Sequence, residues 1–180
     1  MFAKYVGVNP QDINWVIHPW SENLRLFSEG KIDAFFASYP HLPELHKKKI
    51  GHTLVSTTTD KPWAQHTCCL IATTKEFVQK HPVATKRALR ALLKATDICA
   101  SEPTRVARFL ADKGYASYDI ALEMLRDLPY NWREYDPEDA VRFYALRMRE
   151  LGMIKSTPQK IIAQGTDWRF LNQLKRELKA

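Results

Sequence analysis

The sequence predicts an α/β fold, with a parallel-type sheet near the start of the chain and helices after it. Two observations support this. The run Ile32–Ala37 shows no polar alternation after Asp33, which is typical of a strand buried on both faces of a parallel sheet. From Pro82 onward, apolar residues recur with the period of an amphipathic helix. We therefore expect an α/β part over residues 1–62 and a strand followed by helices over residues 63–180.

Strand-like and helical segments alternate along the first part. Met1–Gly7 is expected to be the end of a helix. Ser21 is the expected N-cap of a helix that stops at Gly30, and Leu42–Lys49 is expected as a second helix. Between them lie β-rich runs that we expect as strands, namely Ile13–His18, Ile32–Ala37 and His52–Thr58. This alternation predicts βαβ units with right-handed crossovers.

The second part begins with an isolated strand, Gln65–Thr73, which follows the turn Asp60–Trp63. Periodicity and end signals then predict five helices: Pro82–Cys99, Ser101 (as N-cap) to Gly114, Ser117–Leu128, Asp136 (as N-cap) to Leu151, and Trp168–Leu178 after a cap at Thr166 or Asp167. Helices give that strand nothing to pair with, and an unpaired apolar strand leaves unbonded backbone groups. Its neighbours are therefore expected to be encoded elsewhere or supplied by a partner.

The charge pattern argues against a nucleic-acid-binding protein. The net charge of +7 is carried entirely by residues 61–180. Basic residues alternate there with acidic ones along the expected helices, which favours solvated helix faces. No run is long and apolar enough to span a bilayer. Met1–Val6 does not look like a secretory signal, so the chain as written is expected in the cytoplasm.

The three cysteines do not form a disulfide framework, because their number is odd and two are adjacent. Cys68 and Cys69 lie in an apolar run and are interpreted as small buried residues. A metal site with His66 is the alternative interpretation. We expect no metal and no cofactor.

Three runs occur in the order and spacing of a known family. V-x-x-x-D-I-N-W-V begins at Val8, F-x-x-G-K-I-D-A begins at Phe27, and F-V-x-K-H-P-V-A-T-K-R-A-L-R-A-L-L-K-A begins at Phe77. Together they resemble the NMT1/THI5-like and SsuA-like group of type II periplasmic binding proteins. That group includes binding proteins for sulfonates, taurine, nitrate and thiamine-pyrimidine precursors. The similarity covers essentially the whole chain.

The resemblance implies two α/β lobes joined by a hinge, with the ligand between them. This chain would start inside lobe two and return to lobe one as helices. It would then be a truncated product or a fragment, which explains the missing signal and the isolated strand together. The implied function is periplasmic solute binding for an ABC importer, without catalytic residues. The implied partners are a small-molecule solute and the permease subunits, with membrane contact only through the transporter and no nucleic acid.

The alternative is a thiamine-pyrimidine synthase of the THI5 type. Such enzymes resemble the chain in fold but use a histidine and a cysteine-rich motif. Here only His66-Thr-Cys68-Cys69 is present in place of the longer motif.

Solute contacts are expected beyond the carboxyl ends of the strands and near helix N-termini. The candidates there are His18, Trp20 and Ser21 after the first strand, Ser38 and Tyr39 after the second, and Trp63, Gln65 and His66 at the crossover turn. Trp20 and Trp63 suit stacking on a planar solute or packing between lobes. Ser21 suits anion binding or plain helix capping, and His18 suits an anion contact or a structural role.

Overall fold

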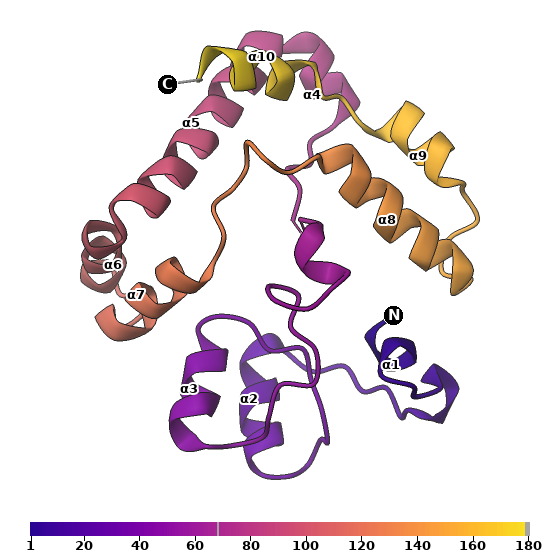
Figure 1. The fold of residues 1–180 in the computed structure, drawn as a ribbon, viewed down its shortest axis with the longest axis vertical. Helices are drawn as coiled ribbons and strands as arrows, with labels where there is room; N and C mark the ends of the chain where they lie inside the picture. Colours follow the sequence, from indigo (N-terminus) through magenta and orange to yellow (C-terminus); the bar gives the residue numbers. More distant parts are fainter. Residues whose placement is uncertain (68, 179–180) are drawn as a thin grey trace. The chain divides into compact units, whose positions relative to one another are not determined.

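The computed structural model describes residues 1–67 and 69–178, and all the regular elements in that part of the chain are helices (Figure 1). The chain forms two compact units. The N-terminal unit combines Phe2–Val55 with Glu102–Leu128, and the C-terminal unit combines Ser56–Ser101 with the chain from Pro129 onward. The division into lobes at residue 62 stays a prediction.

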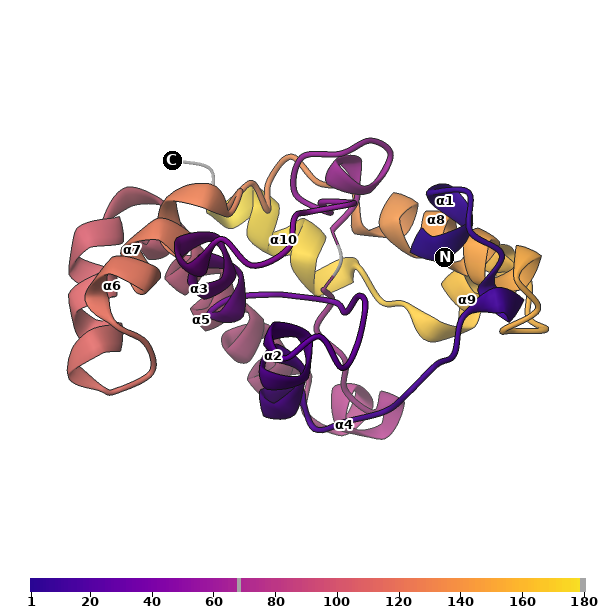
Figure 2. The same cartoon turned by 90° about the horizontal axis from the view of Figure 1, so that it is seen from below.

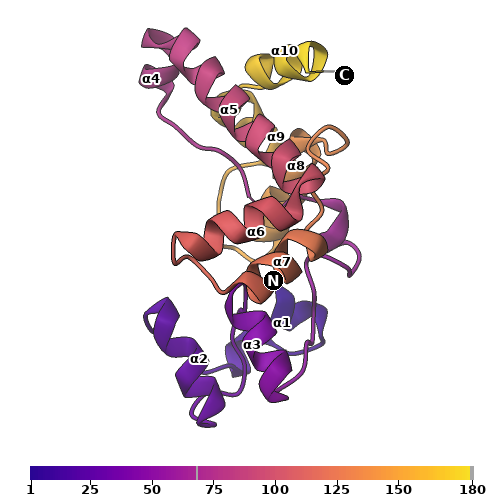
Figure 3. The ribbon, with the colours of Figure 1, turned by 90° about the vertical axis from the view of Figure 1, so that its left-hand side faces the viewer.

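The N-terminal unit contains α1 (Phe2–Tyr5), the 3-10 turn η1 (Pro10–Asp12), α2 (Trp20–Ser28), α3 (His41–Lys48), α6 (Pro103–Asp112) and α7 (Tyr118–Asp127). Helices α6 and α7 pack side by side (Figure 3). The buried apolar side chains of this unit are Leu26, Leu45, Ala107, Ala121 and Leu125.

The C-terminal unit contains η2 (Trp63–Gln65), α4 (Lys75–Lys80), α5 (Pro82–Ser101), α8 (Pro137–Glu150), α9 (Pro158–Gly165) and α10 (Arg169–Glu177). Helix α5 contacts α4 and α10, and α8 contacts α9 (Figure 2). The carboxylate of Glu177 on α10 binds Lys86 at 2.6 Å and also Arg90, which fixes α10 on α5. The buried apolar side chains are Trp63, Leu93, Ala140, Ala145, Phe170 and Leu174.

The predicted sheet does not form within the described residues. No strand occurs in Ile13–His18, Ile32–Ala37, His52–Thr58 or the described part of Gln65–Thr73, from which Cys68 is left out. A strand exists only through hydrogen bonds to a neighbour, and no backbone hydrogen bond of the described residues joins two of these segments. Large apolar side chains stand exposed in all four of them: Trp15, Val16, Ile17, Phe36, Leu54, Leu70 and Ile71.

The predicted N-caps Ser21 and Ser101 were wrong. Helix α2 begins at Trp20 with Pro19 in the cap position, so Ser21 lies in the first turn instead of capping it. Helix α5 continues through Ser101, and Glu102 takes the cap position of α6. The break between α5 and α6 lies at Glu102, because a residue that precedes a proline is disfavoured in the helical conformation.

The predicted start of α8 is confirmed. The Asp136 side chain accepts hydrogen bonds from the backbone N–H groups of Glu138 and Asp139, and Pro137 occupies the first helical position. The last helix begins at Arg169 with Trp168 in the cap position instead of the predicted Thr166 or Asp167, and the Asp167 side chain accepts from the Arg169 N–H.

Helices α4 and α9 were not among the five helices predicted from periodicity and end signals. Each is capped by a threonine side chain, Thr74 for α4 and Thr157 for α9.

Among the described residues, the structure holds no helix with the length and apolar character needed to cross a membrane.

Candidate functional site

The N-terminal unit brings the ends of the first two predicted strands together around Trp20. The Trp20 indole is 47% exposed. Its ring centroid lies 6.2 Å from the His41 ring and 6.3 Å from the Phe36 ring. Because Phe36 and His41 flank Ser38 and Tyr39 in the sequence, the two predicted groups of candidates adjoin each other here.

The other candidates of this unit differ in what they contact. Ser21 is exposed in the first turn of α2, and His18 is half-buried. The half-buried Ser38 hydroxyl donates to the carbonyl of Tyr39 at 3.3 Å. The Tyr39 phenol donates to Asp127 Oδ2, at the end of α7, over 2.7 Å. The Tyr39 hydroxyl therefore already has a protein acceptor.

In the C-terminal unit the candidate residues pack onto α8. Trp63 is only 2% exposed. Its ring meets Phe143 edge-on at 5.4 Å and stacks on Tyr144 at 6.4 Å. His66 stacks on Phe143 with centroids 4.1 Å apart, and its Nδ1 lies 3.4 Å from Asp139 Oδ2.

Gln65 is exposed beside this aromatic cluster. With the Trp63 indole buried against α8, a solute would reach Trp63 only if that packing opened, so its role as a solute contact stays a prediction. The candidates thus divide between the units, with His18, Trp20, Ser21, Ser38 and Tyr39 in one and Trp63, Gln65 and His66 in the other.

Sequence reasoning missed Phe36, His41, Phe143 and Tyr144. His41 follows Ser38 and Tyr39 in the same turn, so extending the strand-end rule by two residues would have found it. Phe143 and Tyr144 lie more than seventy residues after Trp63, and no local signal links them to it.

A family model described as the NMT1-like family matches residues 2–111. The chain belongs to the NMT1-like family. Two similar proteins are named bicarbonate-binding protein CmpA. The one from Synechococcus elongatus is 27% identical over 119 residues, and the one from Synechococcus sp. is 26% identical over 119 residues. Each match covers 64% of this chain and 26% of the relative.

The chain thus spans about a quarter of the length of the curated relatives that it matches. No solved structure matches it.

The cysteines of this NMT1-like chain lie in different surroundings. Cys69 is exposed, whereas partial burial raises the pKa of the Cys99 thiol above its usual range. Cys68 lies outside the described residues. Within residues 1–67 and 69–178, no three His, Cys, Asp or Glu side chains form a group that could hold a metal ion.

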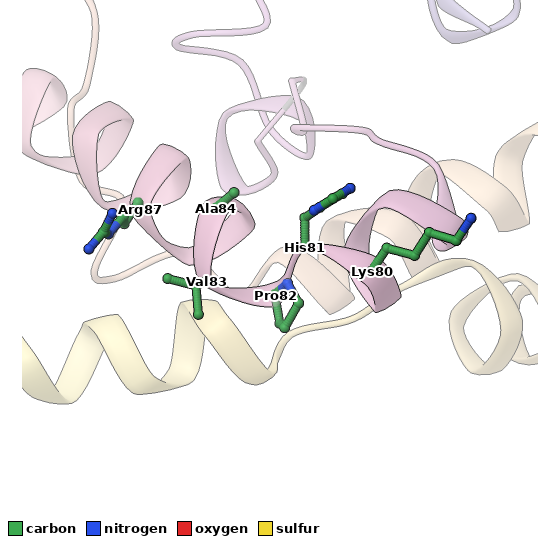
Figure 4. Close-up of a pocket in the computed structure, with 6 residues that line it drawn as sticks. All are labelled: Lys80, His81, Pro82, Val83, Ala84 and Arg87. Atoms are coloured by element: carbon green, nitrogen blue, oxygen red, sulfur yellow. The ribbon is translucent and has the colours of Figure 1, made fainter.

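An open hollow lies where α4 meets α5, and none of the eight candidates lines it. It is lined by Lys80, His81, Pro82, Val83, Ala84 and Arg87. Lys80 and His81 point away from Arg87 (Figure 4), and Lys80 pairs with Glu76 at 2.6 Å. Because its basic groups do not converge on one point, this hollow is a poor match for a binding site in the NMT1-like chain.

Proposed function

We propose that this chain is part of the extracytoplasmic solute-binding protein of an ABC importer and that it catalyses no reaction. The observation that carries the proposal is the exposed Trp20 ring beside Phe36 and His41. An open aromatic face next to an imidazole, with the Ser21 and Ser38 hydroxyls nearby in the sequence, offers stacking and hydrogen bonds to a small solute. Membership of the NMT1-like family supports this assignment.

The proposed solute is a small anion, such as a sulfonate, nitrate, taurine or bicarbonate. His18 lies two residues before α2, and His41 begins α3 with its ring 6.2 Å from that of Trp20. Their imidazoles supply N–H donors, and a protonated imidazole favours an oxyanion. The name of the two relatives, bicarbonate-binding protein, supports an oxyanion of this size.

The proposed fold of the whole receptor is two α/β lobes, with permease subunits as its partners in the membrane. Three of the segments predicted as strands, Ile13–His18, Ile32–Ala37 and Gln65–Thr73, carry one charged residue between them, Asp33, and expose large apolar side chains. This is the composition of strands that are covered on both faces. We infer that the remainder of a full-length receptor supplies their neighbours.

Thiamine-pyrimidine synthesis stays the alternative prediction. It depends on His66, Cys68 and Cys69. The ring of His66 is stacked on Phe143 and Cys69 is exposed. No contact of the described residues favours this chemistry over solute binding.

Calorimetric titration of the full chain with bicarbonate, nitrate, sulfate and taurine tests the proposal. We expect saturable binding of at least one anion, lost in Trp20→Ala and retained in Trp15→Ala. Trp15 is a matched control because it is another exposed tryptophan, at 68%, of the same unit. Absence of binding by every anion, or equal binding by Trp20→Ala and the unmodified chain, would contradict the proposal.

A further inference from the structure

The two compact units differ in net charge. The N-terminal unit holds ten basic and ten acidic residues and is neutral, so the C-terminal unit carries the whole net charge of +7. The excess is largest on α5, where four basic residues face one acidic residue, Asp97. The alternation of charge expected for a solvated face therefore does not hold on this helix. Positive charge that gathers in one part of a chain indicates an anionic partner for that part.

The basic residues of α5 lie on one face of the helix, because each lies three or four residues from another. Helix α10 packs against α5 and adds Arg176, whose positive charge acts on the neighbouring Glu177 carboxylate. We call this surface the basic ridge, and it consists of Lys86, Arg87, Arg90 and Lys94 on α5 and Arg176 on α10.

Most of the positive charge of the basic ridge is not neutralised within the described part of the chain. Glu177 is its carboxylate partner there, and it binds Lys86 at 2.6 Å and also Arg90. Arg87 and Lys94 are both exposed, and neither forms an ion pair with another described residue. One carboxylate against five cations leaves the ridge strongly positive, so an anionic surface placed on it meets complementary charge.

The layout of the ridge fits an extended anionic surface better than one small ion. From Lys86 to Lys94 the cations are distributed along about 12 Å of the helix axis. Val83, which is 65% exposed, lies four residues before Arg87 and therefore on the same face. Basic and exposed apolar side chains on one face are typical of a helix at a membrane surface. A nucleic-acid backbone, by contrast, offers an aliphatic side chain no apolar surface.

We infer that the basic ridge binds the surface of a bilayer that contains anionic phospholipids. The headgroup phosphates accept hydrogen bonds from Arg87 and Lys94, and Val83 enters the boundary between headgroups and acyl chains. This contact is additional to any contact through permease subunits. It goes beyond the proposed function and does not depend on solute binding beside Trp20.

Co-sedimentation of the full chain with phospholipid vesicles tests the inference. Neutral vesicles contain phosphatidylcholine alone, and anionic vesicles contain about 30% phosphatidylglycerol. We expect binding to the anionic vesicles only, and we expect it to weaken as NaCl rises from about 50 to about 300 mM, because salt screens exposed charges. No binding at the lowest salt, equal binding to both kinds of vesicle, or binding that salt does not weaken would overturn the inference.

A paired substitution locates the contact on the ridge. Arg87→Gln combined with Lys94→Gln should weaken binding to anionic vesicles by roughly tenfold or more. The matched control combines Lys155→Gln with Lys160→Gln, which removes the same charge from exposed positions of the same unit outside the ridge. The control should weaken binding by less than about threefold. Equal weakening by the two double variants would show an effect of net charge alone and would contradict a role for the ridge.

A labelled DNA duplex distinguishes a membrane from a nucleic acid as the partner. Fluorescence anisotropy should show weaker binding to the duplex than to anionic vesicles at equal phosphate concentration. Binding to the duplex that is as tight as binding to the vesicles would assign the ridge to nucleic acid instead. Calorimetry with small anions and Trp20→Ala reports on the solute site, so failure of the proposed function is seen separately from failure at the ridge.

Discussion

The imidazole of His66 lies flat against the phenyl ring of Phe143, with centroids 4.1 Å apart and planes inclined by 13°. Phe143 also meets Trp63 edge-on, and the Arg147 guanidinium lies 5.6 Å above the same ring. The turn that carries Trp63 and His66 is thereby fixed to α8. This packing sets where the apolar segment after His66 begins.

Trp63→Ala should destabilise the C-terminal unit by about 3–5 kcal/mol, because it removes the largest side chain of this cluster from a site that is 2% exposed. Trp15→Ala is the control. Trp15 is 68% exposed and is held by one hydrogen bond from its Nε1 to the Pro10 carbonyl, so its loss should cost about 1 kcal/mol. Urea unfolding followed by circular dichroism measures the unfolding free energy of both variants. Equal losses of unfolding free energy in the two variants would contradict the buried placement of Trp63.

A pH dependence is expected from Asp97 on α5. Its carboxylate accepts hydrogen bonds from Arg133 at 2.6 and 2.9 Å and from the Trp132 indole at 2.7 Å. The Arg133 guanidinium is the main reason that the pKa of Asp97 lies below its usual range, with partial burial opposing it and Trp132 adding to it. Because the folded-state pKa is lowered, this stabilisation is complete above the unfolded value of about 4 and is lost as the pH falls through the folded value.

Asp97→Asn should therefore cost about 1 kcal/mol at neutral pH, and the difference from the unmodified chain should shrink as the pH falls below about 4. Denaturant unfolding at a series of pH values measures this. Asp112→Asn, on an exposed position of α6, is the control for a general effect of removing one negative charge. A difference that stays constant down to about pH 2 would show that the Arg133 pair does not stabilise the fold.

Local signals predicted much of the helical part. The Asp136-Pro137 pair located the start of α8, because capping and a fixed proline φ act within one turn. Helix α9 starts with the same kind of pair, Thr157-Pro158, but its eight residues are too few to show a clear apolar period. The helix break at Glu102 was misplaced by one residue because Ser101 has the stronger capping preference.

Strand formation and the neighbours of the candidate residues depend on contacts between residues that are distant in the sequence. Apolar composition indicates that a run such as Ile13–His18 suits a strand, but strand formation requires a neighbour, which the run itself does not specify. The strand-end rule selected Trp20 and Tyr39 as candidates, but their contacts with His41 and Asp127 join segments that are distant in the sequence.

Two glycines give a matched test of the packing around Phe27. Gly51 and Gly30 have φ values of +68° and +69°. An added Cβ at Gly51 would lie 2.6 Å from Phe27 Cζ, whereas at Gly30 nothing lies within 4 Å. Each alanine variant should lose about 1–2 kcal/mol to the left-handed backbone, and Gly51→Ala should lose about 1–3 kcal/mol more to the clash.

Thermal unfolding of the two alanine variants measures the difference. Adding Phe27→Leu to Gly51→Ala should recover part of the loss, because it removes the ring atoms that clash. Equal stability of Gly51→Ala and Gly30→Ala would mean that Phe27 does not approach Gly51.

The hydrogen bond from Tyr39 to Asp127 allows the role of the Tyr39 hydroxyl to be measured. Tyr39→Phe should lower the unfolding free energy by about 1 kcal/mol, because the 2.7 Å bond joins the turn before α3 to the end of α7. Asp127→Ala should cost a similar amount, and the double variant should cost less than the sum, since both changes remove one interaction. Denaturant unfolding of the four proteins gives this coupling free energy. Additive losses would show that the bond contributes nothing. A Tyr39→Phe effect on anion affinity alone would assign the hydroxyl to the solute instead of to α7.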